Sequence, residues 1–272
     1  QTLHAPWAGM TAFERHGLRL ASLARSGPHR LPELIAAMGE GPMGERIGRV
    51  VEPTVVAPAP TEKEADIQVA YLVAVLQQAA RLREQALRKL SLADRQFLFD
   101  HAASLAEQFT PQVSGSDERT RKQAEKNRRF SQLVGEQLDG ASLVAAAQVL
   151  AHLSDDEWLS LVQENFQARR PLPTTIPGIT GDILLTRSTQ AGLIVIGGPG
   201  PNSYELDQQV ALLIDLGGDD HYQGLIASPA TAEQGISVVI DLAGEDTYRA
   251  APLGLATGRL GVGLLLDREG ND

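Results

Sequence analysis

Three stretches of this chain align without gaps and decide its fold: Leu212-Leu-Ile-Asp-Leu-Gly-Gly-Asp-Asp-His-Tyr222, Val238-Val-Ile-Asp-Leu-Ala-Gly-Glu-Asp-Thr-Tyr248 and Leu264-Leu-Leu-Asp-Arg-Glu-Gly-Asn-Asp272. Equivalent residues in successive stretches are 26 positions apart. A partial copy that ends in Tyr204 precedes the first stretch by 18 residues. A fixed period of this length is typical of stacked units, each of which buries its apolar residues against its neighbours.

The apolar triplet that opens each copy is too short for a helix and is rich in residues that favour strands. The remaining residues of each repeat are rich in glycine, so they leave little room for a helix. We therefore expect a parallel β-solenoid over residues 171–272, with one coil of 26 residues per repeat. A leucine-rich repeat is excluded because its Leu-x-x-Leu-x-Leu-x-x-Asn signature does not occur in the repeats.

The charge divides the chain into two regions. Residues 171–272 contain 13 acidic and 4 basic residues, a net charge of −9, whereas residues 1–170 have a net charge of −1. An acidic segment repels nucleic acid and anionic membranes, and it suits cations or basic partners. We expect no membrane span, because no apolar run is long enough. The absence of cysteine excludes disulfides and cysteine-ligated metals.

Residues 1–170 are expected to form an all-helical domain, which makes the fold class α+β with two domains. Apolar spacing and capping patterns predict helices over residues 11–26, 31–38, 61–90, 91–109 and 139–169. The last of these contains a second capping box at Ser154-Asp-Asp-Glu157. Residues 117–138 are expected to be a solvated helix or a mobile connection, and residues 52–60 a proline-rich linker.

The aspartates of the repeat are the candidate metal ligands. Stacked strands lie about 4.8 Å apart, so equivalent aspartates should form columns. Carboxylates about 5 Å apart repel one another by roughly 3 kcal/mol at an effective dielectric constant near 20. The carboxylates must then spread into water or share a hard cation such as Ca²⁺, which prefers six to eight oxygen ligands. One column contains Asp215, Asp241 and Asp267; the other contains Asp220, Asp246 and Asp272.

A second interpretation of the aspartates stays open. An aspartate before a glycine turn often accepts hydrogen bonds from the backbone of its own turn and binds no metal. Capping and metal binding are equally supported for the column that begins at Asp215. Metal binding is favoured for the column that begins at Asp220.

The turns resemble part of a known calcium-binding repeat. Gly218-Asp-Asp-His-Tyr222, Gly244-Glu-Asp-Thr-Tyr248 and Gly270-Asn-Asp272 are similar to half of the nonapeptide repeats of RTX proteins. That resemblance implies a parallel β-roll in which carbonyls of the glycine turns and carboxylates of the aspartates hold Ca²⁺. The ligands would then include Gly218, Gly244 and Gly270. It covers residues 197–272, and the period of 26 residues departs from the family pattern, because it is not a multiple of nine.

Tyr204, Tyr222 and Tyr248 recur in the same register. They are most simply an aromatic stack between the repeats. The functional alternative is a ligand-binding stack that contacts a sugar, which would make a polysaccharide a possible partner.

These observations favour a non-enzymatic scaffold or binding protein, secreted or periplasmic, that Ca²⁺ stabilises. One alternative is a carbohydrate-active β-helix enzyme, a polysaccharide lyase or glycosidase, with Asp219, Asp220, Glu245 and Asp246 as acid and base. The regular recurrence of these acids counts against an active site. Another alternative is an assembly subunit that docks through its helical region.

The partner expected from the repeat is a protein at its C-terminal edge. Nothing after Leu264-Leu-Leu-Asp267 is typical of a cap on the last repeat, and stacked repeats need such a cap. We therefore expect further coils of the same protein, or a separate protein, to cover the C-terminal edge.

Overall fold

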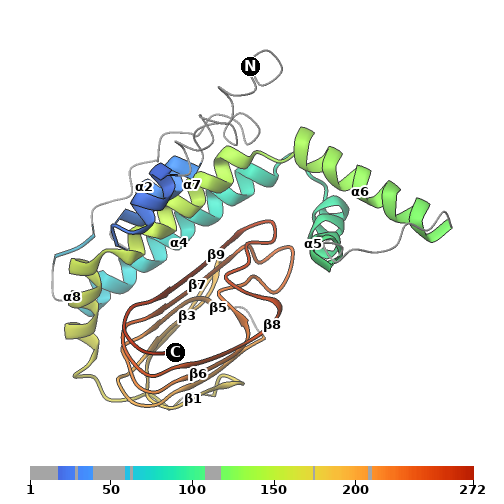
Figure 1. Ribbon diagram of the computed structural model, residues 1–272. Coiled ribbons are helices and arrows are strands. Elements are labelled where there is room, and N and C mark those ends of the chain that lie inside the picture. Colours follow the sequence, from blue (N-terminus) through green and yellow to red (C-terminus); the bar gives the residue numbers. More distant parts are fainter. Residues whose placement is uncertain are drawn as a thin grey trace.

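The computed structural model of the protein describes residues 18–27, 30–38, 59–61, 64–107, 118–173, 175–207 and 210–272. Its first part is helical and its second part is built of strands (Figure 1). Residues 18–24 are helical. The labelled α-helices are α2 (Leu31–Met38), α4 (Ala65–Leu87), α5 (Leu92–Glu107), α6 (Glu118–Glu136), α7 (Gly140–Ala151) and α8 (Asp156–Phe166). A short 3-10 helix, His152–Ser154, separates α7 from α8. No helix among the described residues is both long and apolar enough to cross a membrane.

The strands form two sheets. The four-stranded sheet has the order β1-β4-β6-β8, and the five-stranded sheet has the order β2-β3-β5-β7-β9. The bounds of the strands are β1 (Ile179–Thr180), β2 (Ile183–Thr189), β3 (Gly192–Gly197), β4 (Ser203–Leu206), β5 (Val210–Asp215), β6 (His221–Ile226), β7 (Ile236–Asp241), β8 (Thr247–Leu255) and β9 (Val262–Asp267).

The expected parallel β-solenoid is wrong. Both sheets are open and mixed, because β1 pairs antiparallel with β4 and β2 pairs antiparallel with β3. The physical reason lies before the repeats: Gln190 and Ala191 form a tight turn that folds β2 back onto β3 as a hairpin. The remaining neighbours pair in parallel. The register is mainly 18 residues for β3–β5 and β4–β6 and mainly 26 residues for β5–β7, β6–β8 and β7–β9, so Asp215 lies beside Asp241, and Asp241 beside Asp267.

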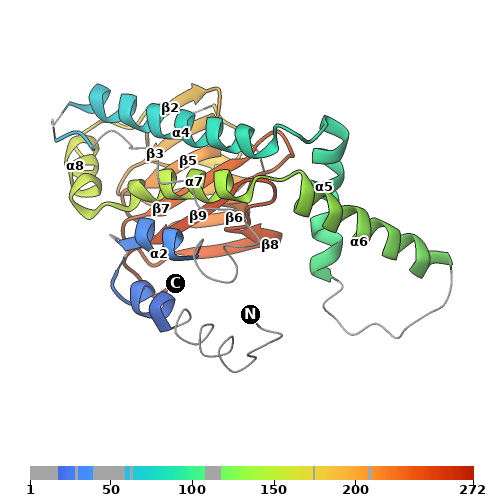
Figure 2. The same cartoon turned by 90° about the horizontal axis from the view of Figure 1, so that it is seen from above.

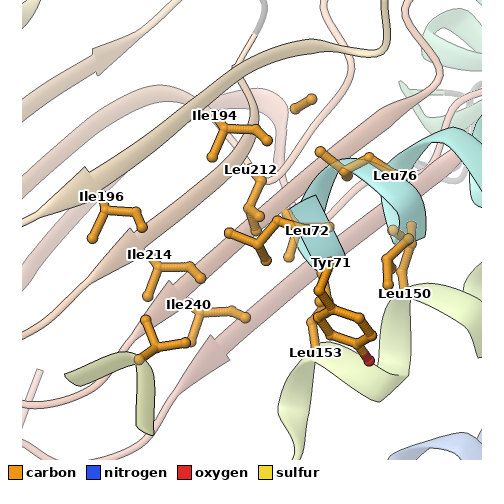
Figure 3. Close-up of a cluster of buried hydrophobic side chains, with 14 of the residues drawn as sticks. Tyr71, Leu72, Leu76, Leu150, Leu153, Ile194, Ile196, Leu212, Ile214 and Ile240 are labelled. Carbon is orange, nitrogen blue, oxygen red and sulfur yellow. The ribbon is translucent and has the colours of Figure 1, made fainter. Parts of the chain in front are cut away.

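Helices cover the outer face of the five-stranded sheet, and the four-stranded sheet covers its inner face (Figures 1 and 2). Side chains that alternate along β3, β5 and β7 form one core with α4, α7 and α8, as Leu212 and Leu72 show in Figure 3. Their neighbours on the other face, such as Leu213 and Val239, form a second core between the sheets. Both faces of β5 and β7 are therefore buried, which explains why the strands are apolar without alternation.

Helix α4 is buried on more than one side. Val75 and Ala79 are buried, and so are Leu72 and Leu76. This follows because α4 packs against both α7 and the five-stranded sheet. The buried amide of Gln68 also has a partner here, since its Oε1 accepts a hydrogen bond from Trp158 Nε1 at 2.6 Å.

Arg83 ties α4 to two loops between the strands. Its side chain is 4% exposed. The guanidinium donates to the backbone oxygens of Leu260 at 2.9 Å and Glu233 at 3.0 Å, and to that of Ala232. No sequence motif indicated this contact.

The helix ends mostly follow the sequence. Ser91 Oγ accepts the backbone N–H of Asp94 at 3.1 Å, as its capping role predicts. Residues 139–169 form two helices rather than one, and the second is capped by Asp155 instead of Ser154. Residues 118–136 form a helix that projects beyond the sheets together with α5 (Figure 2). Residues 11–17 of the first expected helix and 52–58 of the expected linker lie outside the described residues.

Candidate metal centre

The first column of aspartates caps the turns that follow β5 and β7. Asp215 Oδ1 accepts the backbone N–H of Gly217 at 2.8 Å, and Asp241 Oδ1 accepts that of Ala243 at 3.0 Å. Each aspartate therefore stabilises the turn two residues ahead of it. The capping interpretation is confirmed for these two aspartates, which are both fully buried.

The tyrosine column supplies donors to the same carboxylates. The hydroxyl of Tyr204 donates to Asp215 Oδ2, and that of Tyr222 donates to Asp241 Oδ2. The rings stack, with centroids 5.1 Å apart between Tyr204 and Tyr222 and 4.7 Å apart between Tyr222 and Tyr248. Tyr204 and Tyr222 are 0% and 1% exposed, so they present no ring face to a sugar.

The second column forms a hydrogen-bonded ladder. Asp220 Oδ1 accepts the backbone N–H of Asn202 at 2.6 Å. Asp246 Oδ1 accepts the N–H of Asp220 at 2.8 Å, and Asp272 Oδ1 accepts the N–H of Asp246 at 2.5 Å. One oxygen of each carboxylate is thereby fixed by a backbone N–H.

Asn202 is a member of the site that sequence analysis missed. It begins the ladder, and its Nδ2 donates to Asp215 Oδ2 at 2.9 Å. The signal was present in the sequence: Asn202 precedes Tyr204 by two residues, as Asp220 precedes Tyr222. A neutral amide at this position donates a hydrogen bond where an aspartate would add repulsion.

The two columns bring the carboxylates together in two groups. In each group, one oxygen from each of three residues lies within 4.8 Å of the others. The inner group is fully buried, whereas two members of the outer group reach solvent. The inner group is Asp215, Asp220 and Asp241, and the outer group is Asp246, Asp267 and Asp272.

Each group contains one buried carboxylate oxygen without a hydrogen-bond partner in the described part of the chain. These oxygens are Asp220 Oδ2 and Asp246 Oδ2. Asp220 is 0% exposed and Asp246 is 6% exposed. A buried anionic oxygen without a partner is costly, so a cation or a proton must neutralise it.

Protons fill this role when no cation is bound. Burial raises the pKa of Asp220 to about 8, and repulsion from Asp215 adds to the shift. Burial also raises the pKa of Asp241 to about 9, although the hydrogen bond from Tyr222 opposes the shift. Burial raises the pKa of Asp246 and of Asp267 above its ordinary value as well. A cation bound here would displace protons, so its affinity should increase with pH.

The glycines of the repeat allow successive turns to stack closely. Gly218 has a φ of +125° and Gly244 a φ of +159°. A Cβ atom on Gly244 would lie 1.8 Å from the backbone oxygen of Gly218, and one on Gly270 would lie 2.1 Å from that of Gly244. These positions exclude any side chain. That their carbonyls bind a metal stays a prediction.

The acids proposed for catalysis occupy different surroundings. Asp220 is buried, and Asp219 Oδ1 accepts the backbone N–H of Glu245 at 3.2 Å. A cavity of about 520 Å³ lies instead between α4 and the β2–β3 hairpin, where Arg83 and Gln190 line it. Its lining residues include no member of either acidic group.

Comparisons of the chain with protein-family models, with curated proteins and with solved structures give no match. A functional argument therefore depends on the side chains of the site themselves.

Proposed function

We propose that this chain is a non-enzymatic scaffold or binding protein whose aspartate columns hold a hard divalent cation, Ca²⁺ being the first candidate. The observation that carries the proposal is the buried oxygen Asp246 Oδ2, which has no hydrogen-bond partner among the described residues and belongs to a group of three carboxylates. A bound cation would neutralise the charge that the stacking of the repeats brings together.

The donor set supports a hard cation. Both groups offer only carboxylate oxygens, which suit Ca²⁺, Mg²⁺ or Mn²⁺ rather than softer metals. Oxygens that lie within 4.8 Å of one another can share one cation whose bonds to oxygen are about 2.4 Å long. Ca²⁺ also tolerates irregular coordination, whereas Mg²⁺ requires nearly ideal octahedral geometry.

A location outside the cytoplasm accords with this chemistry. A site in which solvent supplies part of the coordination shell binds Ca²⁺ weakly, and extracellular modules bind it with dissociation constants of about 10⁻⁴–10⁻³ M. We therefore include a secreted or periplasmic location in the proposal.

The scaffold role concerns the edge of the five-stranded sheet at β9. Leu264 and Leu266 are only half-buried, whereas their equivalents in β5 and β7 are buried. An exposed strand edge of this kind can accept a further strand from a protein partner. Hydrogen exchange of the isolated protein should be faster at alternate amides of β9 than throughout β7, and equal protection of the two strands would contradict an open edge.

Calcium binding is tested by titration calorimetry and thermal denaturation of the full chain after EGTA treatment. Saturable Ca²⁺ binding and a higher Tm in millimolar Ca²⁺ are expected, because a ligand that binds only the folded state stabilises it. The absence of both effects at pH 8, where fewer carboxylates are protonated than at neutral pH, would remove the cation from this proposal.

A further inference from the structure

We infer that the two acidic groups have different roles: the outer group, Asp246, Asp267 and Asp272, binds one exchangeable cation, and the inner group is a hydrogen-bonded structural element that binds none. This inference rests on the proposed function and assigns its site to one end of the columns. It depends on the hydrogen bonds that the carboxylates already make and on their access to solvent.

The carboxylates of the inner group already accept many hydrogen bonds. Asp215 accepts three, from Gly217, Asn202 and Tyr204. Asp241 accepts two, from Ala243 and Tyr222, and Asp220 accepts one, from Asn202. A cation among these oxygens would compete with donors that the fold itself supplies.

The outer group has many more free oxygens. Within the described residues, backbone N–H groups donate to Asp246 Oδ1 and Asp272 Oδ1. The hydroxyl of Tyr248 interacts with the Asp267 carboxylate, as its equivalents do with Asp215 and Asp241. Asp215 and Asp241 each accept a backbone N–H of their own turn as well, and no such bond to Asp267 is present in the described part of the chain.

Asp246 belongs to this group and has one buried oxygen that accepts no hydrogen bond from the described residues. Its Oδ1 is fixed by the N–H of Asp220 at 2.8 Å, and its Oδ2 is buried and without a partner. The residue is 6% exposed, so water does not reach that oxygen from outside the site. The neighbouring carboxylate oxygens of Asp267 and Asp272 lie within 4.8 Å, close enough for one cation to contact all three.

Solvent access separates the groups further. Every member of the inner group is 0% exposed. Ca²⁺ needs six to eight oxygen ligands, which three carboxylates supply only with help from carbonyls or water. Asp267 is half-buried and Asp272 is exposed, so the outer group has the water that completes the shell and a path for exchange.

Three aspartate-to-asparagine variants of the full chain test this assignment by calorimetric titration with Ca²⁺ at pH 8. Asp267→Asn and Asp272→Asn should each weaken binding by more than about tenfold, because each removes one charged ligand. Asp220→Asn is the matched control from the equivalent register position, and it should change the affinity by less than about threefold. An asparagine Oδ1 can still accept the ladder hydrogen bond, and melting in EGTA checks that each variant is folded.

Each result has a distinct meaning. Binding of one Ca²⁺ per chain that is lost in Asp267→Asn and Asp272→Asn but kept in Asp220→Asn supports the inference. Loss of binding in Asp220→Asn, or two equivalent ions per chain, overturns the inference and leaves the proposed function standing. No binding by the unchanged protein in millimolar Ca²⁺ refutes the proposed function itself.

Discussion

Replacing Arg83 with methionine should loosen the attachment of helix α4 to the strands. The arginine is buried, and its guanidinium donates to the backbone oxygens of Ala232, Glu233 and Leu260. Two of these residues precede β7 and the third precedes β9. Methionine keeps most of the apolar stem and removes these three hydrogen bonds, together with the ion pair that Arg83 makes with the exposed Glu84.

The magnitude follows from two opposing effects. A hydrogen bond from a charged donor contributes about 1.5–3 kcal/mol, so three such bonds set an upper limit near 9 kcal/mol. Burial of the guanidinium offsets part of this, and it lowers the pKa of Arg83 from its ordinary value. The adjacent cavity of about 520 Å³ also lets water reach the freed carbonyls. We expect a net loss of about 2–4 kcal/mol in the free energy of unfolding.

Urea denaturation followed by circular dichroism measures this loss. Arg81→Met is the matched control: Arg81 lines the same cavity and is exposed, so its replacement should change stability by less than about 0.5 kcal/mol. Gly235→Ala supplies a second check, because the new Cβ would lie 1.9 Å from Arg83 Nε. Its cost should fall when Arg83 is already methionine. Equal stability of the Arg83 and Arg81 variants would refute this reasoning.

Three other predictions concern the columns and the core. In EGTA, stability should fall as the pH rises, because the pKa of Asp220 is raised to about 8 and that of Asp241 to about 9, against an ordinary value of about 3.9. Protonation of these two aspartates stabilises the fold fully below about pH 4, and this stabilisation is lost as the pH rises through 8 and 9. A Tm that stayed level from pH 5 to 9 would contradict this prediction. Tyr222→Phe removes the donor to Asp241 and should cost about 1–3 kcal/mol in urea denaturation; an unchanged stability would argue against the tyrosine–aspartate bond. Leu72→Ala should cost about 2–5 kcal/mol in the same assay, because Leu72 is buried in the core that α4 shares with the five-stranded sheet, and a loss below about 1 kcal/mol would exclude that shared core.

The repeat in the sequence predicted which residues meet. A spacing of 26 residues placed Asp215, Asp241 and Asp267 in one column, and the parallel strands pair them in that register. The expected helix around Val75 is present as α4, within the bounds set by the apolar spacing. Both predictions depend on periodicity, which reports neighbours directly.

The repeat did not predict how the sheets end. The antiparallel strands β1 and β2 lie before the first full copy, where the chain has no period to follow. The solenoid expectation failed at this point, because it extended the geometry of the copies to residues 171–200. Arg83 was likewise missed, since its partners are backbone oxygens about 150 and 177 residues away in the sequence.

The candidate site, too, was predicted only in part from the sequence. Sequence spacing brought the aspartates together, but it left capping and metal binding as alternatives. Only side-chain positions show that Asp215 accepts three hydrogen bonds while Asp246 keeps a buried oxygen without a donor. Asn202 could have been found by extending the alignment to the partial copy before Tyr204.

An anomalous difference map from crystals grown with Mn²⁺, a hard cation that also prefers oxygen ligands, tests the central claim most directly. The account predicts one peak within coordination distance of carboxylate oxygens of Asp246, Asp267 and Asp272, and none among Asp215, Asp220 and Asp241. A map without a peak at the outer group, recorded from crystals at pH 8 in millimolar Mn²⁺, would contradict the claim that these columns hold a cation.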